Sequence, residues 1–361
     1  MRHADVVIVG GGPAGSSCAR ALVRAGAEVL VIDRARFPRD KVCAGWITPR
    51  VLAAAALDPD EYRASGLVLQ PFTGFCTGVL PDRRLVATRY GEAVSYGIRR
   101  CEFDTFLLGR SGARVIEGTA VDRLRRAGDR WIVNDAVSAA VIVGAGGQFC
   151  PVTRHLNPPS RDGLVVAREI EVSLEGERCA IESDVPELYF CRDLDGYGWC
   201  VRKGDYLNVG FGRRTSRDFH THARAFADWL RTAQAVPARA LDAASWRGHA
   251  YRLRGATPAV AGEDVLLAGD AAGLAWPESG EGIAPAVESG IAAAQTIVAH
   301  RGRVPHAAAA AYRAAIGAAA RPGRALPVPL ARSLLRVPAV ARYALDRWFL
   351  RVTDQRHARA A

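Results

Sequence analysis

The stretch DVVIVGGGPAG, residues 5–15, decides how this chain folds. Its first part, 5–9, is a short apolar run that ends in glycine, which predicts a buried strand of a parallel sheet. Gly10, Gly12 and Gly15 then follow at the G-x-G-x-x-G spacing. Glycines at this spacing permit a tight turn from a strand into a helix and let the backbone approach a phosphate closely.

The residues after the glycines complete a nucleotide-binding pattern. A helix is predicted for 13–26, beginning at Pro13 and Ala14, and a second strand for 28–32, which ends at Asp33. The helix N-terminus offers unpaired N–H groups to a pyrophosphate, and the carboxylate can accept bonds from both ribose hydroxyls. Because that carboxylate would repel a 2′-phosphate, NADP fits poorly here. The pattern predicts a dinucleotide and leaves FAD and NAD open.

A second ligand-binding pattern lies near the other end of the chain. An apolar strand is predicted for 265–268, and it leads into GDAAGLAWPESGEGIAPAVESGIAAA, residues 269–294. Asp270 lies where it can accept a hydrogen bond from a ribityl hydroxyl. Gly282 begins a helix predicted for 282–300, whose N-terminal N–H groups can stabilise negative charge on the N1/O2 edge of a reduced flavin. We therefore expect both ends of the chain to converge on one ligand.

Five blocks of this sequence resemble the geranylgeranyl reductase family, within the larger p-hydroxybenzoate-hydroxylase-like flavoprotein group. Besides the first glycine motif, GDAAG with the later P-x-x-G-E-G-I is in register with the family pattern. KVCAGW (41–46) is similar to its K-x-C-G-G segment and RRCEFDTFLL (99–108) to its R-x-x-F-D-x-x-L block. GYGWCVRKGDYLNVGFG (196–212) is similar to its aromatic segment. The resemblance extends over residues 5–300 and implies an FAD-dependent oxidoreductase.

The motifs and the resemblance together assign the candidate site. The cofactor-binding residues are Gly10, Gly12, Pro13, Ala14, Gly15, Asp33, Arg34, Lys41, Cys43, Ala44, Arg100, Val121, Gly269, Asp270, Pro277, Gly280, Gly282 and Ile283. By resemblance Cys43 faces the flavin and donates a proton or shapes the substrate end; the alternative is a small buried thiol that packs the loop. Four residues are candidates for the substrate: Tyr197, Trp199, Lys203 and Trp276. Lys203 either meets an anionic head group or is a solvated strand end.

The sequence departs from the family pattern at two places. The group usually has G-A-D-G where this chain has Gly-Ala-Gly-Gly at 144–147, so a carboxylate near the cofactor is missing and FAD is expected to bind somewhat differently or more weakly. Val201 and Arg202 replace the usual Phe-Pro of the aromatic segment, which leaves the substrate class open.

Composition sets broad limits on function. The chain has 361 residues, of which 49% are hydrophobic and 24% charged, so it can bury a substantial core. Its net charge is +11, but the arginines are scattered and no nucleic-acid module is present. We interpret the charge as a compositional bias, with steering of anionic substrates or membrane surfaces as the alternative. The eight cysteines form no C-x-x-C pair, so reduced thiols and no metal site are expected.

The predicted fold class is α/β, or α+β overall. A Rossmann-like FAD-binding domain formed by 1–65, 99–160 and 255–303 is interleaved with a substrate domain formed by 66–98 and 161–254. The first should gain short strands at 114–117, 131–134 and 139–143. The second should hold an antiparallel sheet with strands at 163–171, 187–192, 197–202 and 206–211.

The remainder, 304–361, is a predicted helical C-terminal segment with helices at 307–320 and 330–351. Two interpretations of the second helix stay open, a basic amphipathic element on a membrane surface and a cover for the substrate domain. No targeting signal is evident at the N-terminus, so a cytoplasmic protein is expected, either free or at the membrane periphery. Oligomeric state is undetermined.

The leading functional prediction is reduction of a carbon–carbon double bond in a hydrophobic prenyl, polyketide or lipid-like substrate by hydride from N5 of reduced FAD. A monooxygenase, a hydroxylase on the same fold, is the first alternative, because fold does not settle function. The GYGWCV segment lacks most of the halogenase pattern G-W-x-W-x-I-P, so halogenation is not expected. A non-catalytic flavin-binding partner protein is the second alternative. No second glycine motif occurs, so the electron donor is left open between NAD(P)H that binds transiently and a separate reductase partner.

Overall fold

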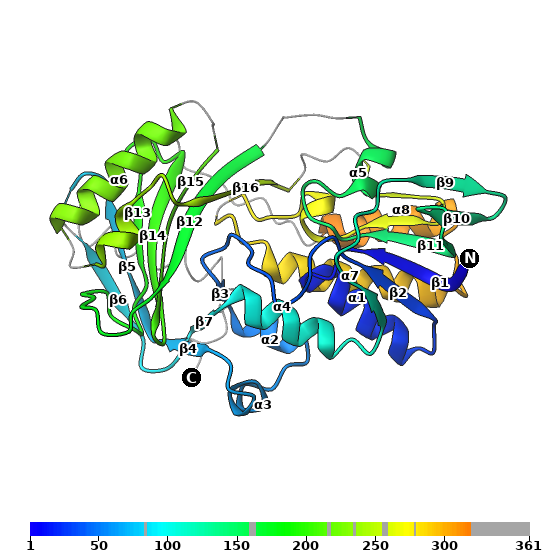
Figure 1. Cartoon of the computed structure of the whole chain (residues 1–361), viewed down its shortest axis with the longest axis horizontal. Coiled ribbons are helices and arrows are strands. Elements are labelled where there is room, and N and C mark those ends of the chain that lie inside the picture. Colours follow the sequence, from blue (N-terminus) through cyan, green and yellow to red (C-terminus); the bar gives the residue numbers. More distant parts are fainter. Residues whose placement is uncertain are drawn as a thin grey trace. The chain divides into compact units, whose positions relative to one another are not determined.

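The protein is described from a computed structural model, which defines residues 1–82, 85–158, 164–214, 218–233, 236–254, 259–277 and 279–318. Two compact units divide these residues (Figure 1). Unit 1 takes those of Met1–Asp40, Cys101–Gly163 and Tyr251–Pro322, and unit 2 takes those of Lys41–Arg100 and Leu164–Ala250. The predicted helix at 330–351 lies outside the described residues.

Unit 1 is built on an eight-stranded sheet with the order β17-β18-β11-β1-β2-β8, and β10 and β9 extend from β11. The central strands β18, β11, β1, β2 and β8 pair in parallel, and every residue of β2 is buried, as an apolar run without alternation predicts. The strands are β1 Arg2–Val9, β2 Val29–Ile32, β8 Arg114–Ile116, β9 Leu124–Ala127, β10 Arg130–Val133, β11 Val137–Gly144, β17 Ala261–Gly262 and β18 Val265–Leu267.

Helices of unit 1 follow the strands and pack on them. Figure 1 shows α1 and α7 side by side; a Cβ on Gly290 of α7 would lie 2.1 Å from the carbonyl oxygen of Ala14 in α1, so only glycine allows this approach. Tyr312 of α8 is buried and donates a hydrogen bond to the carbonyl of Leu267 (2.7 Å), which ties that helix to β18. The helices are α1 Pro13–Arg24, α4 Arg100–Gly109, α5 Pro151–Leu156, α7 Ile283–Ala299 and α8 His306–Ala318, with a 3-10 turn η2 at Gly269–Ala272.

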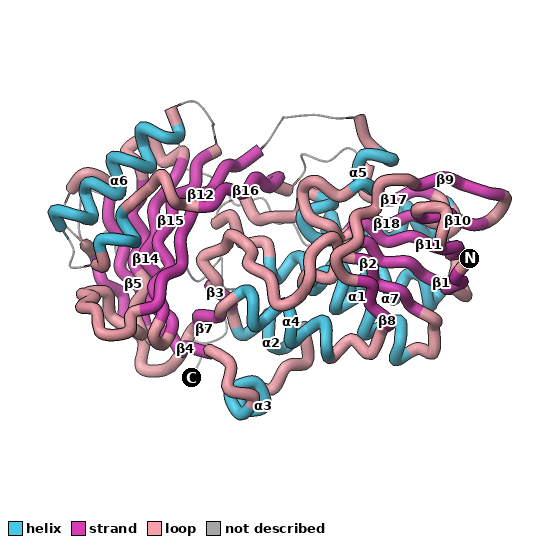
Figure 2. Tube along the Cα trace, viewed as in Figure 1, coloured by secondary structure: helices cyan, strands magenta, loops and turns pink. Residues whose placement is uncertain are grey.

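Unit 2 holds a seven-stranded sheet with the order β16-β12-β15-β14-β13-β5-β6 (Figure 2). The pairs β12–β15, β15–β14, β14–β13 and β5–β6 are antiparallel, as predicted, whereas β13 runs parallel to β5. Long-range pairing of this kind leaves no local signal in the sequence. The strands are β5 Gly74–Val79, β6 Val86–Arg89, β12 Leu164–Ser173, β13 Glu187–Phe190, β14 Gly196–Lys203, β15 Tyr206–Arg213 and β16 Arg247–Arg252.

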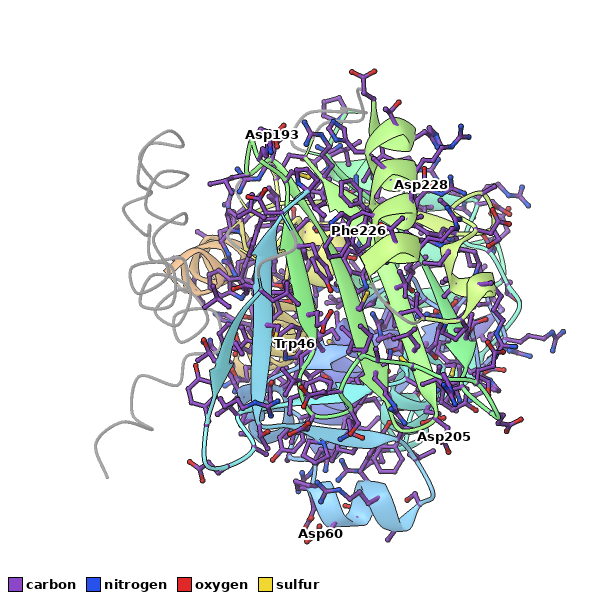
Figure 3. The ribbon with its side chains drawn as sticks, turned by 90° about the vertical axis from the view of Figure 1, so that its left-hand side faces the viewer. Trp46, Asp60, Asp193, Asp205, Phe226 and Asp228 are labelled. Carbon is purple, nitrogen blue, oxygen red and sulfur yellow. The ribbon has the colours of Figure 1, made fainter. Side chains whose placement is uncertain are left out.

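Helix α6 (Phe219–Ala233) covers one face of this sheet, and it was not predicted (Figure 3). Phe226 is fully buried, and a Cβ on Gly198 of β14 would lie 2.5 Å from its ring, so the helix packs directly on the strands. The apolar cluster beneath α6 includes Tyr189, Leu207 and Phe211. We call the side covered by α6 the helix face. The opposite side, which carries the alternate residues of the same strands, among them Glu169, Trp199 and Asn208, is the thiol face. The 3-10 turn η1 at Ala238–Leu241 also packs with the helix-face cluster.

A three-stranded sheet completes unit 2, with β7 (Ser95–Ile98) between β3 (Trp46–Ile47) and β4 (Leu69–Phe72). Helices α2 (Pro49–Ala54) and α3 (Pro59–Ala64) connect β3 to β4. Residues 41–65 were predicted within the FAD-binding domain. They group with unit 2 because β3 pairs with β7, whereas the described residues after 303 group with unit 1 through α8.

Candidate functional site

The glycine turn of unit 1 depends on glycine for two reasons. Gly10 has a φ of +109°, and a Cβ there would lie 2.4 Å from the carbonyl oxygen of Ala145. A Cβ on Gly15 would lie 1.8 Å from the carbonyl oxygen of Gly10. Larger residues at either position would collide with backbone, which cannot move aside. The glycines at positions 10 and 15 are therefore required by packing inside unit 1.

Gly12 differs, because the space beside it is open. A Cβ on Gly12 would meet Arg39 Nη2 at 3.3 Å and no other described atom within 4 Å. Gly12 is the N-cap of α1 and makes no side-chain cap, so the first N–H groups of the helix are available to a ligand. This is the geometry that a pyrophosphate requires.

Arg39, which was not among the predicted site residues, adds a cation beside Gly12. We call the glycine turn, the start of α1 and Arg39 together the glycine cradle. Nη2 of Arg39 lies 3.2 Å from Oδ2 of Asp104, which is fully buried in α4, and its guanidinium lies 4.8 Å from the ring centre of Phe37. Both contacts hold the guanidinium beside Gly12. Arg39 and Asp104 are far apart in the sequence, so no local pattern indicates that they pair. The one related signal is the R-x-x-F-D block, which contains Asp104.

Asp33 ties the second strand to the glycine turn. Its Oδ2 accepts a hydrogen bond from the N–H of Gly11 (2.7 Å), its Oδ1 accepts one from Ala35 (2.8 Å), and the side chain is buried. Each carboxylate oxygen can accept a further hydrogen bond, which leaves capacity for ribose hydroxyls. The contact with the ribose stays a prediction. The neighbouring Arg34 is exposed.

The second motif lies against the first. A Cβ on Gly269 would lie 3.1 Å from Cβ of Ala14, and a Cβ on Gly282 would lie 3.2 Å from Oδ1 of Asp270. Gly269 is held in place by its N–H bond to Ser289 (2.9 Å). Like α1, helix α7 begins after a glycine that makes no side-chain cap. The two motifs therefore lie side by side within unit 1, and their convergence on one ligand stays a prediction.

The other predicted residues of unit 1 have structural contacts of their own. Val121 is buried in the core of unit 1. The guanidinium of Arg254 lies 4.5 Å from the ring centre of Trp276. The N–H of Trp276 donates to the carbonyl of Glu281 (2.9 Å), and the N–H of Gly280 donates to the carbonyl of Trp276 (2.8 Å), so the backbone of Trp276 is bonded to the residues just before α7. Pro277 and Gly280 lie before α7, and Ile283 begins it.

In unit 2, the loop of Cys43 is held by side chains of the thiol face. The N–H of Cys43 donates to Oε1 of Glu169 in β12 (2.7 Å). Nδ2 of Asn208 in β15 donates to Oε2 of Glu169 (3.0 Å) and approaches the carbonyl of Cys43 (3.5 Å). The thiol itself is half-buried and accepts from the N–H of Gly45 (3.4 Å). Glu169 and Asn208 were not predicted.

Lys203, at the end of β14, is fully buried in the same cluster. Its ammonium lies 2.5 Å from Oε2 of Glu171 and donates to the carbonyl of Ala44 (3.2 Å). Arg99 pairs with the other oxygen of Glu171 (2.9 Å). Lys203 is therefore not a solvated strand end, and its contact with an anionic head group stays a prediction.

Aromatic side chains extend along β13 and β14 on the thiol face. The rings of Tyr197 and Trp199 lie 5.9 Å apart, and Phe190 lies 5.8 Å from Tyr197. The indole N–H of Trp199 donates to Oδ1 of Asn208 (2.7 Å). The polar cluster and the aromatic row are therefore connected through Asn208. Lys41 and Arg100 lie at the ends of the first segment of unit 2, and Arg100 is buried.

Burial raises the pKa of both glutamates and neighbouring cations lower it, but the balance differs between the two. Burial raises the pKa of Glu169, and the nearby Lys203 and the bonds from Cys43 and Asn208 only partly oppose it. Burial also raises the pKa of Glu171, but Lys203 and Arg99 outweigh it, so the net pKa is lowered. Glu171 is thus held as a carboxylate by two cations.

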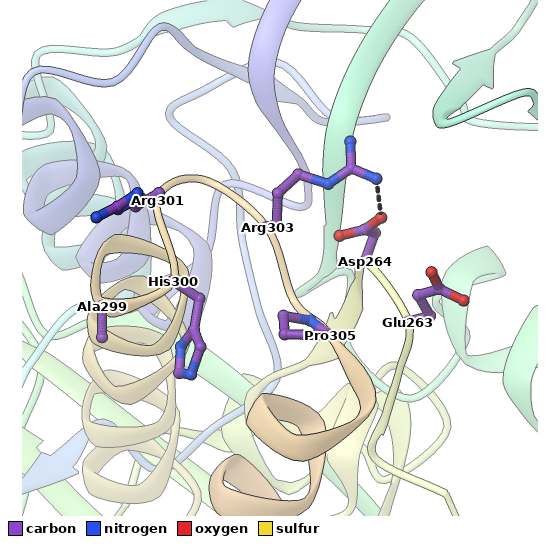
Figure 4. Close-up of a pocket in the computed structure, with 7 residues that line it drawn as sticks. All are labelled: Glu263, Asp264, Ala299, His300, Arg301, Arg303 and Pro305. Carbon is purple, nitrogen blue, oxygen red and sulfur yellow. Dashed lines mark hydrogen bonds and ion pairs between the residues drawn. The ribbon is translucent and has the colours of Figure 1, made fainter.

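A surface pocket of about 320 Å³ lies elsewhere in unit 1 (Figure 4). Asp264 on its wall accepts from Arg303 (2.5 Å), Arg126 (2.8 Å) and the N–H of Val304 (2.8 Å). Asp264 lies at the amino end of β18, whereas ligands of such sheets bind at the carboxyl ends of the strands. We therefore assign Asp264 a structural role. Its lining residues are Glu263, Asp264, Ala299, His300, Arg301, Arg303 and Pro305.

Across the described ranges, no group of His, Cys, Asp and Glu could hold a metal ion. Among those same residues no helix is both long and apolar enough to cross a membrane.

Known proteins resemble this chain throughout both units. A family model described as FAD dependent oxidoreductase matches residues 5–99. A menaquinone reductase of Mycobacterium tuberculosis (strain CDC 1551 / Oshkosh) is 32% identical, over 81% of this chain and 76% of its own. A geranylgeranyl diphosphate reductase of Rhodobacter capsulatus is 28% identical, over 82% and 75%. A geranylgeranyl bacteriochlorophyll reductase-like structure from Thermoplasma acidophilum has a TM-score of 0.73 at 20% identity, over 88% and 84%.

These matches show that the chain is an FAD-dependent oxidoreductase. It belongs to the geranylgeranyl reductase family, as the resemblance of its motifs implied. FAD is therefore the cofactor, and the α/β fold class is confirmed. The open Gly12 cradle, the uncapped start of α1 and the Arg39 guanidinium fit its pyrophosphate.

Proposed function

We propose that this enzyme reduces a carbon–carbon double bond in a hydrophobic, prenyl-type lipid. The observation that carries the proposal is in unit 2, where Asn208 joins the loop of Cys43 to the aromatic Trp199. The backbone of the loop that carries the Cys43 thiol is thus connected to the aromatic row through Asn208. The names of the relatives, a menaquinone reductase and a geranylgeranyl diphosphate reductase, support this substrate class.

Reduced FAD, when bound, supplies hydride from N5, and the protein supplies placement and electrostatics. We propose that Gly12, the start of α1 and Arg39 bind its pyrophosphate, with Asp33 and Asp270 on the ribose and ribityl hydroxyls. Tyr197 and Trp199 would line the site of the apolar chain and exclude water. The Cys43 thiol would donate a proton to the second carbon.

The electron donor, NAD(P)H or a reductase partner, stays part of the proposal, as do a cytoplasmic location and contact with a membrane surface. A lipid substrate favours access from such a surface. The C-terminal segment predicted for that contact lies outside the described residues.

Stopped-flow absorbance of the photoreduced holoenzyme tests the proposed function. We expect rapid anaerobic reoxidation by a geranylgeranyl lipid and slow reaction with air-saturated buffer. A hydroperoxide-like absorbance band with oxygen, and no reaction with lipid, would replace the reductase by the hydroxylase. Protein that stays reduced with every acceptor would favour the non-catalytic flavin-binding protein.

A further inference from the structure

We propose that Glu169 is a positioning residue that fixes the backbone of Cys43, and that Trp199 and Asn208 orient its carboxylate for this task. The geometry of the loop does not depend on the proposed function; only the consequence for catalysis rests on it.

The direction of every hydrogen bond in this chain of residues follows from Trp199. An indole N–H only donates, so the atom of Asn208 that it meets at 2.7 Å must be the amide oxygen. The NH₂ group of Asn208 then faces Glu169 at 3.0 Å. Because the other oxygen of Glu169 meets the N–H of Cys43 at 2.7 Å, both carboxylate oxygens must accept. A carboxylate satisfies this arrangement, whereas an amide would oppose one NH₂ group with another.

Two consecutive residues of the loop are held from the thiol face, and the next one, Gly45, is held by Ile98 of β7. Glu169 holds the N–H of Cys43, and Lys203 holds the carbonyl of Ala44. Gly45 has a φ of +67°, and a Cβ there would lie 2.7 Å from the ammonium of Lys203 and 2.1 Å from the carbonyl oxygen of Ile98. A short segment between strands gains a single conformation from these contacts, and the thiol gains a single orientation.

The arrangement contains buried charge. Glu169 and Lys203 are both buried, and Glu171 pairs with Lys203 and with Arg99. Buried ionic groups seldom add net stability compared with apolar residues of similar volume. Their contribution here is the specific geometry of residues 43–45.

The matched pair Glu169→Gln and Glu187→Gln tests the proposal. Glu187 is buried to a similar degree on the helix face of the same sheet, where Tyr189 bonds to it. Iodoacetamide labelling of the FAD-loaded full chain, with peptide mapping of each cysteine, measures the exposure of the Cys43 thiol. We expect labelling of Cys43 to accelerate about tenfold in Glu169→Gln, because the loss of one buried hydrogen bond to a charged group opens the loop. Labelling in Glu187→Gln should remain within about twofold of the parent protein.

Asn208→Ala provides a second variant if Glu169→Gln does not fold. It leaves the carboxylate but removes its orienting amide, and we expect labelling of Cys43 to accelerate about threefold. With a lipid substrate, Glu169→Gln should lower kcat and leave KM within about twofold. Equal labelling of Cys43 in the parent protein and in the folded thiol-face variants would overturn the positioning role. Because labelling needs no substrate, this result is separate from a failure of the proposed reaction.

Discussion

The glycine cradle of unit 1 and the Cys43 loop of unit 2 present their functional groups by opposite means. The cradle uses backbone: Gly10 and Gly15 exist so that two segments can approach, and the start of α1 provides N–H groups. The loop uses side chains, because Glu169 and Lys203 reach it from strands far away in the sequence. In the cradle a substitution is harmful where its Cβ would meet backbone, whereas the loop loses a contact whenever one of its side-chain partners is removed.

The largest effect is expected within the cradle, where neighbouring glycines should fail in different ways. Gly15→Val should not accumulate as folded protein, since its Cβ would overlap the carbonyl of Gly10. Gly12→Val should fold, because its Cβ position is open, but bind FAD at least ~100-fold more weakly, since the side chain would occupy the pyrophosphate space. Thermal unfolding and flavin absorbance after desalting measure both. A yellow Gly12→Val protein would refute the pyrophosphate assignment.

Removing the buried cation of the loop should be the next largest effect. Lys203→Ala leaves Glu171 with one cation and the carbonyl of Ala44 without its donor, so the free energy of unfolding should fall by about 3–5 kcal/mol. Denaturant unfolding measures it. The double variant Lys203→Met with Glu171→Leu should recover much of the loss, because an apolar pair carries no desolvation cost. If the double variant were less stable than the single one, the ion pair itself would be a net source of stability.

A smaller effect is expected for the cation of the cradle. Arg39→Ala should weaken FAD binding about tenfold, since one charge-assisted contact to the pyrophosphate is lost while the backbone contacts remain. Arg36→Ala removes the same charge from an exposed position nearby and should leave affinity unchanged. Fluorescence titration of apoprotein with FAD compares them. Equal affinities in all three proteins would remove Arg39 from the site.

The smallest effects should appear in the pH dependence of stability, with opposite signs for the two glutamates. The pKa of Glu171 is lowered, so its contribution is present above the ordinary glutamate value of 4.5 and is lost as the pH falls through its lower folded pKa. The pKa of Glu169 is raised, so its contribution is present below 4.5 and is lost as the pH rises through its higher folded pKa.

Denaturant unfolding of Glu169→Gln and Glu171→Gln between about pH 3 and pH 8 measures these slopes. The stability advantage of the parent protein over Glu171→Gln should grow as the pH rises, and its advantage over Glu169→Gln should shrink. Parallel slopes for the two variants would contradict the opposite electrostatic environments of these carboxyls.

The cradle could be predicted from sequence because its constraints are local. Gly10 to Asp33 lie within one strand–helix–strand segment, and each glycine has a geometric reason that spacing alone reveals. Short strand segments at close spacing likewise predicted β12, β13, β14 and β15. Helix α6 was missed although Phe219, Ala223, Phe226 and Leu230 recur at helical spacing, a signal that a search for helices in this region could have found.

The loop network could not be predicted, because its partners meet only through sheet pairing. Glu169 and Cys43 are 126 positions apart, and Trp199 reaches Asn208 only because β14 and β15 are neighbours. Cys43, Trp199 and Lys203 were predicted as site residues, but Glu169 and Asn208, which connect them, were not. A carboxylate in a strand carries no signal that it will accept two hydrogen bonds beneath a distant loop.

The most direct test of C=C reduction is an anaerobic single turnover of the reduced holoenzyme with a geranylgeranyl lipid, followed by mass spectrometry of the product. We predict a product heavier by two hydrogen atoms, formed in the parent protein and strongly reduced in Cys43→Ser, with Cys76→Ser as the control. A product that gains an oxygen atom once air is admitted, with no hydrogenated lipid before, would contradict this prediction.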